Sequence, residues 1–125
     1  MTLPAIFDRL RLPIIASPLF LVSGPDLVIA QCKAGIVGSF PALNARPQTM
    51  LDEWIHRITE ELAAWNRDNP DRPAAPFAVN QIVHKSNNRW EEDMVTCEKW
   101  QVPIVITSLG AREDLNAAVT RWGGV

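Results

Sequence analysis

Short apolar runs rich in β-branched residues alternate with longer amphipathic stretches along this chain. The apolar runs are Ile14–Ser17, Ile36–Phe40, Phe77–Val83 and Val102–Thr107. Continuous apolar runs of this length are typical of strands in a parallel sheet that is buried on both faces. The stretches between them have the three-and-four spacing of helices. The pattern therefore predicts four βα units of a single α/β domain.

The first helix is expected directly after the segment Ser23–Asp26. The order Ser-Gly-Pro-Asp in this segment predicts a capping box, with Pro25 just inside the helix. The helix is expected to end near Ala34, because Gly35 stands where a C-terminal cap needs a left-handed residue. The second strand then follows after a very short connection, which is usual in α/β folds.

Three further helices follow from the periodicity of apolar residues. The second is expected to begin at Pro47 or Thr49, and the third to be capped by Asn87 or Asn88. The residues expected to face inward are Leu51, Trp54, Ile55, Ile58, Leu62 and Trp65 in the second helix, Trp90, Met94 and either Cys97 or Val95 in the third, and Leu115, Ala118, Val119 and Trp122 in the fourth. The segment 66–76, rich in Asp, Pro and Arg, is expected to be a connecting loop.

The composition of the 125 residues, 47% hydrophobic and 21% charged, is that of one globular domain. A formal net charge of -2 gives no basic field for nucleic acid or an anionic membrane, so neither is an expected partner. The charged N-terminus and the apolar run broken by Pro13 and Pro18 fit neither a signal peptide nor a membrane span. We therefore expect a cytoplasmic protein.

The two cysteines, Cys32 and Cys97, lie far apart in the sequence. They form no CxxC pair and have no histidine-rich neighbourhood, so the spacing supports neither a zinc site nor a disulfide framework. We interpret both as reduced thiols in the core and expect no metal.

Candidate ligand-binding residues are those that directly follow each strand. In parallel α/β proteins the carboxyl ends of the strands form one rim, where ligands bind. The segments expected at this rim are Ser17–Leu21, Gly38–Leu43, Asn80–Lys85 and Thr107–Gly110. In the first segment, Pro18 lacks an N–H, and the backbone groups of the next three residues are expected to stay free for the edge of a planar heterocycle. An ordinary strand exit is the alternative interpretation.

Four pieces of the sequence match one family in order. Leu12–Leu19, with the sequence LPIIASPL, resembles the opening "L-P-I-I-x-A-P-M" of the nitronate monooxygenases, formerly called 2-nitropropane dioxygenases. Ala34–Ser39 is similar to that family's "A-G-G-L-G-S/T", Pro76–Asn80 to its "P-F-G-V-N", and Val102–Ser108 to its "V-P-V-V" strand. The departures are Ser17, Leu19 and Phe20, where the family usually has Ala and Met-Ala or Met-Gly.

The resemblance implies a fold and a cofactor. The fold would be a TIM (β/α)8 barrel, of which this chain holds the first four βα units, truncated before the barrel closes. Residues 1–125 would be the N-terminal part of a single FMN-binding domain. The segment from Pro18 through Leu19 and Phe20 to Leu21 would border the FMN ring with its backbone. Asn80 would supply an amide that donates to and accepts from ring heteroatoms.

Each of the remaining polar candidates has a plain alternative. Asn80 is equally well interpreted as an amide that ends a strand. His84 is within reach of flavin or substrate if the loop after the third strand folds over the rim, but a lone loop histidine is more often solvated. Lys85 is more simply a solvated lysine than a phosphate contact. His56 and the five tryptophans are interpreted as helix surface and helix packing.

The resemblance also implies an activity, the oxidation of alkyl nitronates by molecular oxygen to carbonyl compounds and nitrite. The family's catalytic histidine lies in a glycine-rich stretch after a later strand, and no such stretch occurs here, so no catalytic residue is assigned. The expected partners are a small nitronate and oxygen, and the isolated chain is expected to be inactive. The sequence gives no oligomeric state and no exact substrate.

Two alternatives remain open. A flavin-dependent enoyl-acyl-carrier-protein reductase shares the fold and much of the opening motif, and would require NADH. A non-catalytic α/β module, complete at this length, is the rival from another class. The terminal Gly-Gly-Val125 is expected to lead into a fifth strand, so the gene beyond it distinguishes the barrel from the module. Relatives of inosine-phosphate dehydrogenase are disfavoured because neither cysteine follows a strand.

Overall fold

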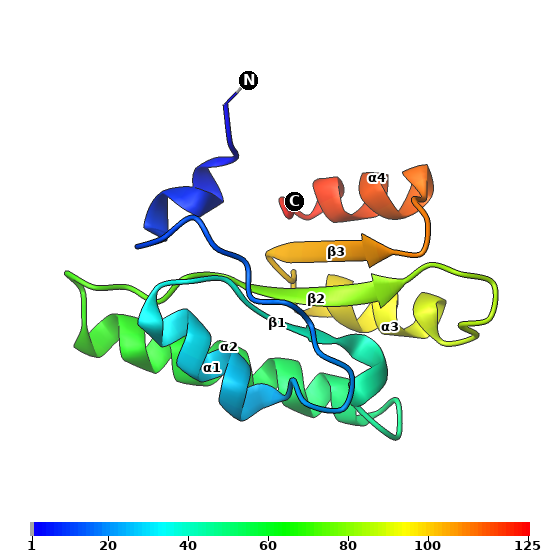
Figure 1. Cartoon of the computed structure of the whole chain (residues 1–125), viewed down its shortest axis with the longest axis horizontal. Coiled ribbons are helices and arrows are strands. Elements are labelled where there is room, and N and C mark those ends of the chain that lie inside the picture. The colour runs from blue at the N-terminus through cyan, green and yellow to red at the C-terminus, as the bar shows by residue number, and fades with distance from the viewer. Residues whose placement is uncertain (1) are drawn as a thin grey trace.

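The computed structural model describes residues 2–125 as a parallel sheet with helices packed against it (Figure 1). In chain order the elements are η1 (Ala5–Arg9), α1 (Pro25–Ala34), β1 (Gly38–Pro41), η2 (Ala42–Asn44), α2 (Met50–Asp68), β2 (Phe77–Ile82), α3 (Trp90–Lys99), β3 (Ile104–Ser108) and α4 (Glu113–Arg121). The predicted alternation of strands and helices is confirmed. None of the helices among these residues combines the length and apolarity needed to cross a bilayer.

Every strand lies beside its neighbour in sequence. The sheet order is β1-β2-β3, all parallel. Ile15 extends it on one side through a parallel bridge to Val37. Val125 extends it on the other side, because its N–H donates to the Pro103 carbonyl at 3.1 Å and its carbonyl accepts from Val105 at 2.9 Å. This sequential order is that of a (β/α) barrel, whereas a doubly wound sheet reverses its order midway. The predicted fold class, the first units of a TIM barrel, is confirmed.

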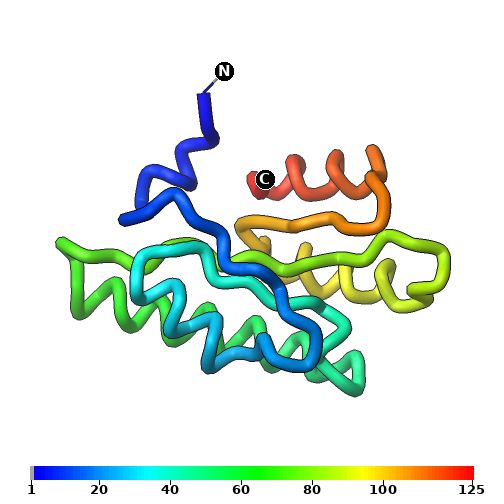
Figure 2. Tube along the Cα trace, in the orientation of Figure 1, coloured from blue at the N-terminus to red at the C-terminus, as the bar shows by residue number. Residues whose placement is uncertain are grey.

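The first predicted strand, Ile14–Ser17, is reduced to the single bridge at Ile15, which corrects its expected length. Pro13 and Pro18 on either side lack the N–H that a longer ladder requires. Figure 2 shows this part of the chain, in blue, running alongside β1 before it turns back into α1. The segment therefore has the direction of a first strand without its regular pairing.

The two faces of the sheet have different partners. Phe40 and Val79 face the helices and belong to the main core, together with α1 and α2 residues such as Val28 and Ile55. The opposite, inner face carries Val37, Ala78 and Ile104. Packed against these are Ile6, Phe7 and Leu10, from η1 and the residue that follows it. Figure 1 shows η1 at the end from which the β2 and β3 arrows start, so it covers the amino end of the inner face.

The helices follow the predicted periodicity, but two predicted N-terminal caps are corrected. The N-cap residue of α3 is Arg89, without a side-chain cap, and not Asn87 or Asn88. In α2, Leu51, Ile55, Ile58 and Leu62 are buried, as predicted. In α3, Cys97 is buried and Val95 is 68% exposed, so of the two alternatives only Cys97 faces inward. The capping box at α1 was a wrong prediction: Gly24 is the N-cap residue, without a side-chain cap. The Ser23 hydroxyl is taken by the N–H of Leu19 instead.

Glycines allow α1 and β1 to approach closely. Gly35 ends α1 in a left-handed conformation, φ 97°, which confirms the predicted cap. A Cβ at Gly38 would lie 2.5 Å from the carbonyl oxygen of Val28 and 3.0 Å from the Cys32 sulfur. Only glycine therefore lets β1 lie this close to α1.

Candidate functional site at the carboxyl end of the sheet

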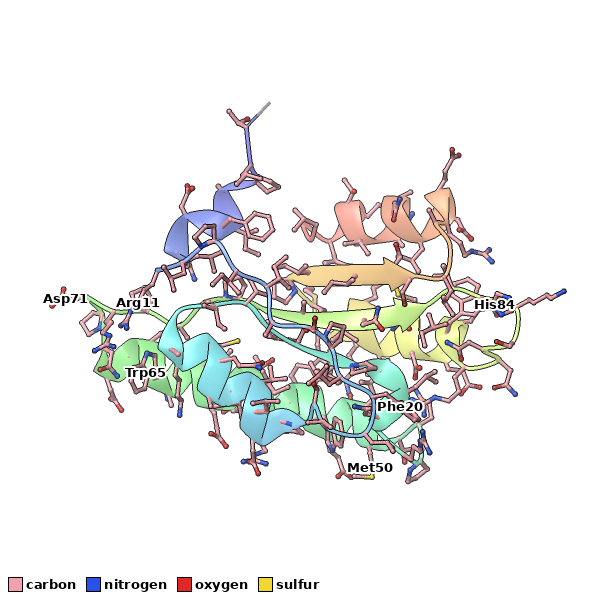
Figure 3. All side chains as sticks on the ribbon, in the orientation of Figure 1. Arg11, Phe20, Met50, Trp65, Asp71 and His84 are labelled. Carbon is pink, nitrogen blue, oxygen red and sulfur yellow. The ribbon has the colours of Figure 1, made fainter. Side chains whose placement is uncertain are left out.

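Two of the four segments predicted for the rim, Ser17–Leu21 and Asn80–Lys85, lie at the same end of the molecule (Figure 3). Figure 3 shows Phe20 and His84 on the side toward which the β2 and β3 arrows point, with Asp71 and Arg11 at the opposite end. Asn80 belongs to the carboxyl half of β2, paired with Pro41 on one side and Ile106 on the other. The segment after Ile15, Asn80 and the loop that follows β2 therefore lie at one end of the sheet (Figure 3).

The segment Pro18–Leu21 forms a compact turn with an apolar surface. The side chains of Leu19, Phe20 and Leu21 are 47%, 60% and 71% exposed. The Leu19 carbonyl accepts from the N–H groups of Val22 and Ser23, which closes the turn. The Leu19 N–H donates to the Ser23 hydroxyl at 2.8 Å. The turn thus presents three large apolar side chains while its backbone is held from behind.

Asn44, at the end of η2, holds this turn with a single side chain. Its Oδ1 accepts from the Leu21 N–H at 3.0 Å. Its Nδ2 donates to the carbonyls of Leu19 and Ser23, at 3.0 and 2.9 Å. Leu21 has a φ of 63°, the left-handed region that costs an L-residue about 1–2 kcal/mol. The side-chain amide of Asn44 therefore forms hydrogen bonds with one N–H group and two carbonyl groups of a turn that contains a strained residue.

These contacts correct one expectation about the turn. The backbone groups of Leu19, Phe20 and Leu21 were expected to be free, but the N–H groups of Leu19 and Leu21 are already donated to Ser23 and Asn44. The N–H of Phe20 has no acceptor among residues 2–125. Because a turn outside the sheet must satisfy its N–H groups locally, side chains take most of them. One donor, that of Phe20, remains for a ligand.

Asn80 is buried on the inner face of the sheet, 6% exposed. Its Nδ2 donates to the Ile106 carbonyl at 3.0 Å and to the Ser108 hydroxyl at 3.1 Å. Both hydrogens of the amide nitrogen are therefore used. Nothing within the described chain donates to Oδ1, which is left as a hydrogen-bond acceptor. Asn80 can accept from a ligand here, whereas donation to one would break a contact with β3.

His84 lies on an exposed loop and is engaged locally. Its Nδ1 accepts from the backbone N–H of Ser86 at 3.2 Å and lies 2.8 Å from the Ser86 hydroxyl. A backbone donor at Nδ1 places the proton of the neutral ring on Nε2. Among the described residues, no hydrogen bond joins His84 to Asn80 or to the turn. Neighbouring Lys85 is exposed and forms no ion pair with any residue that the structure describes.

The turn and Asn80 are separated by one strand. The Ser39 hydroxyl of β1 donates to the Ala16 carbonyl, which ties the segment before the turn to the inner face. Since neighbouring strands are about 4.8 Å apart, the first segment and β2 lie about 10 Å apart across β1. The structure brings the turn and Asn80 to the same end of the sheet, with no hydrogen bond between them among residues 2–125.

A buried ion pair supports the loop that carries Asn44. Arg89, before α3, donates to the carbonyls of Ala45 and Ala42 at 2.7 and 3.1 Å. The same guanidinium donates to Asp93 at 3.0 Å, and Gln48 donates to that carboxylate at 3.2 Å. Asp93 is fully buried. Burial raises its pKa above the usual value, with Arg89 acting in the opposite direction.

Neither cysteine supplies a reactive group. Burial raises the pKa of Cys32 to about 11 and that of Cys97 to about 12. A protonated, buried thiol is neither a nucleophile nor a ready metal ligand. Across residues 2–125, no three His, Cys, Asp or Glu side chains gather in a group that could hold a metal ion.

A cavity of about 440 Å³ lies at the opposite, amino end, lined by residues of η1, the end of α2 and the approach to β2. Its walls are mostly apolar, and its polar side chains are Arg9 and Asn66. Asn66 already accepts from the Ala74 N–H at 2.8 Å. Because ligands of parallel α/β proteins bind at the carboxyl ends of the strands, we assign the candidate site to the rim and not to this cavity.

Sequence reasoning missed Asn44, Ser23 and Arg89 as parts of the site. Asn44 comes one residue after the predicted rim segment Gly38–Leu43, and an asparagine just past a strand is a sequence signal for side-chain bonds to backbone. Ser23 was assigned to the wrong partner. Arg89 bonds carbonyls 44 and 47 positions away, and no local pattern encodes such contacts.

Comparison with known proteins gives similarity in structure only. No family model matches the chain, and a search of curated proteins found no match. Among solved structures, a nitroalkane oxidase from Streptomyces ansochromogenes matches with a TM-score of 0.76 and 19% identity, over 98% of this chain and 41% of that one. A variant of FabK from Thermotoga maritima matches with a TM-score of 0.72 and 17% identity, over 95% of this chain and 35% of that one. The chain thus has the fold of part of a TIM barrel and spans well under half of each neighbour.

Proposed function

We propose that this chain is the N-terminal part of an FMN-dependent enzyme that oxidises alkyl nitronates with molecular oxygen. The observation that carries the proposal is the pairing, at one end of the sheet, of an exposed apolar turn with a single free N–H and a buried amide with a single free acceptor. The likeness to a nitroalkane oxidase supports it. The motifs at four strand ends support it independently.

The residues at this rim fit a planar heterocycle with a polar edge. Leu19, Phe20 and Leu21 offer an apolar wall of the kind that covers a ring. The N–H of Phe20 can donate to a ring oxygen or nitrogen, and Oδ1 of Asn80 can accept from a ring N–H. An isoalloxazine ring carries both kinds of group. The donor of Phe20 and the acceptor of Asn80 are thus complementary to acceptor and donor groups on the edge of a flavin ring.

In this proposal the chain binds and orients the flavin ring, and the cofactor supplies the redox chemistry. An FMN held by these residues would supply the transfer of electrons from the nitronate to oxygen. Phe20 would fix the ring edge through its N–H, and Asn80 would fix its register through Oδ1. The apolar side chains of the turn would exclude water from one face. No group of this chain is assigned to hold the proton α to the nitro group.

His84 is kept as a candidate contact of the same site. The hydrogen bonds from Ser86 leave Nε2–H as the free donor of an exposed ring. Such a donor suits an anionic nitronate or a flavin oxygen. Replacing His84 by Ala is expected to raise KM for the nitronate or weaken flavin binding by a few-fold, with a smaller effect than changes at Asn80. An unchanged His84→Ala enzyme would remove this residue from the site.

The proposal is tested on the full-length gene product. We expect the purified protein to be yellow, to release FMN on denaturation as identified by chromatography, and to consume alkyl nitronates with oxygen uptake and nitrite release. Flavin-dependent reduction of an enoyl thioester with NADH, without nitronate turnover, would instead establish the enoyl-acyl-carrier-protein reductase. A full-length protein that binds no flavin would contradict both and favour the non-catalytic module.

A second experiment uses residues 1–125 alone. Since the chain spans 41% of the nitroalkane oxidase that it matches, we propose that strands outside it complete the flavin site. The purified fragment is then expected to bind FMN weakly and to lack nitronate turnover. A stoichiometric yellow complex after gel filtration would contradict this part of the proposal.

Asn80 offers the sharpest point variant for the proposed site. Asn80→Ala removes the free acceptor and is expected to weaken flavin binding about tenfold, which corresponds to one hydrogen bond of about 1.4 kcal/mol. Ser108→Ala is the matched control, because it removes only the hydroxyl that accepts from Asn80. A larger effect at Ser108 than at Asn80 would mean that the amide acts through packing and not as a ligand.

A further inference from the structure

We propose that Asn44 is a positioning residue that sets the backbone of the turn Leu19–Leu21 and, through it, the affinity for flavin. The inference rests on the proposed function, because the turn is assigned there as the wall of the flavin site. It assigns to an unpredicted side chain the task of holding the Phe20 N–H toward the ligand.

The contacts of Asn44 bracket the one free donor of the turn. Oδ1 holds the N–H of Leu21, directly after Phe20, and Nδ2 holds the carbonyl of Leu19, directly before it. The peptide groups on both sides of Phe20 are therefore fixed by one amide. A donor fixed on both sides loses little conformational freedom when it binds a ligand, which favours affinity.

The turn needs such a clamp because it contains Leu21 in the left-handed region, with a φ of 63°. Without Asn44, the Leu21 N–H would lose its acceptor, and nothing else in the described chain replaces it. Residues in strained conformations persist when surrounding contacts over-determine them, and they are common at ligand sites. Loss of the clamp is therefore expected to let the turn relax away from this conformation.

Asn44 is itself held from the core. Ala42, which begins η2, and Ala45, which directly follows Asn44, accept hydrogen bonds from Arg89 at 3.1 and 2.7 Å. Arg89 is anchored by Asp93, whose side chain is fully buried. A continuous set of contacts thus runs from a buried carboxylate through Arg89 and η2 to the exposed turn. The turn is thus held through Arg89 and η2, and its partly exposed Phe20 ring also has the guanidinium of Arg46 over it, 5.2 Å from the ring centroid.

Only an uncharged amide of this length fits the three contacts. A carboxylate at position 44 would keep an acceptor for Leu21 but would face the carbonyl oxygens of Leu19 and Ser23 without a donor. A protonated carboxylic acid regains one donor. In Asn44→Asp, the ionised side chain is therefore expected not to hold the turn, and the protonated side chain at low pH is expected to restore part of the contacts.

The experiment compares Asn44→Ala and Asn44→Asp with Asn88→Ala in the full-length protein. Asn88 is exposed in the loop before α3, and within the described chain its side chain makes no hydrogen bond, so it is a matched control. The readouts are the exchange rate of the Leu21 amide, the Kd for FMN and the absorbance spectrum of bound flavin. We expect both Asn44 variants to show at least tenfold faster exchange, 10- to 100-fold weaker FMN binding and a shifted spectrum.

The pH dependence separates positioning from simple loss of folding. FMN binding by Asn44→Asp, measured relative to the wild-type protein, is expected to improve as pH falls through the carboxyl pKa, whereas Asn44→Ala shows no such recovery. Should Asn44→Ala fail to fold, this recovery in Asn44→Asp carries the test alone. Its absence overturns the inference.

The remaining outcomes distinguish this inference from the proposed function. If the wild-type protein binds FMN and the Asn44 variants bind it equally well, the inference is wrong and the function stands. Unchanged exchange of the Leu21 amide would also overturn the inference. If the wild-type protein binds no flavin, the proposed function fails, and the inference fails with it.

Discussion

The guanidinium of Arg89 lies 3.0 Å from the carboxylate of Asp93, one helical turn further along, and that carboxylate is fully buried. Burial raises the pKa of Asp93 more than Arg89 lowers it. The folded protein therefore favours the protonated acid more than the unfolded chain does. The ion pair that supports the turn therefore forms against the cost of burying a charge, and the hydrogen bonds from Arg89 to the carbonyls of Ala42 and Ala45 offset that cost.

This pair predicts a pH dependence of stability. The pKa of Asp93 in the folded protein is raised above 3.8. The stabilisation that this carboxyl group gives the folded state is therefore complete below pH 3.8 and is lost as pH rises through the folded-state pKa. Asn at this position cannot ionise. The unfolding free energy of Asp93→Asn minus that of the wild type is therefore expected to increase from pH 3.5 upward, as measured by urea denaturation at several pH values.

Asp114 is the control of opposite sign for the same measurement. Hydrogen bonds from Arg112 lower the pKa of Asp114. The stabilisation that Asp114 gives the folded state is therefore present above pH 3.8 and is lost as pH falls. The unfolding free energy of Asp114→Asn minus that of the wild type is expected to decrease as pH rises. Parallel trends for the two variants would contradict the assignment of Asp93.

The strain at Leu21 predicts an unusual order of variants. Leu21→Gly is expected to raise the unfolding free energy by up to about 1.5 kcal/mol, because glycine removes a left-handed cost of about 1–2 kcal/mol and adds an entropic cost of about 0.5–1 kcal/mol. Little burial is lost, since Leu21 is 71% exposed. Leu21→Val, β-branched, is expected to lower stability by about 1 kcal/mol. Denaturation midpoints that place valine above glycine would rule out strain at this position.

Two glycines separate steric contact from backbone strain. Gly38→Ala is expected to destabilise the protein by about 1–3 kcal/mol or more, because the new Cβ would lie 2.5 Å from the Val28 carbonyl oxygen. Gly123 has a φ of 87° and open space around it, so Gly123→Ala is expected to cost only the left-handed term of about 1–2 kcal/mol. Thermal or chemical unfolding compares the two, and the reverse order would contradict the close approach of α1 and β1.

The buried thiols predict slow chemistry. With pKa values of about 11 for Cys32 and about 12 for Cys97, their thiolate populations at pH 8 are on the order of a hundred- to a thousand-fold below those of free thiols. Both side chains are also fully buried. We expect an aromatic disulfide reagent to modify neither cysteine until denaturant is added. Fast reaction of one thiol in the native protein would show a local opening of its helix.

The sequence was sufficient for the elements whose residues pack locally. The three-and-four spacing of Leu51, Ile55 and Ile58 predicted the buried face of α2, and the apolar run at Phe77 predicted β2. These patterns work because burial on one face of a helix, or on both faces of a strand, imposes a period on the sequence. The end of α1 was predictable for a similar reason, since glycine tolerates positive φ.

The candidate site was predictable in position and not in detail. That Asn80 stands at a strand end follows from the run before it, but that Ile106 and Ser108 occupy its amide nitrogen depends on the register of β3. The clamp by Asn44 joins residues 23 positions apart, and a turn with free backbone groups was the simpler expectation. Such contacts depend on how two loops meet in space, which no local pattern records.

The sequential order of the sheet also has a consequence for synthesis. Each strand pairs with the strand made just before it, from Ile15 through β1 and β2 to β3 and on to Val125. A chain that leaves the ribosome amino end first can therefore add each βα unit to an edge that already exists, without waiting for a distant partner. Contacts of short sequence separation are closed early and at low entropic cost. The turn and its clamp are complete once α3 has emerged, so they can form before β3 and α4 are made.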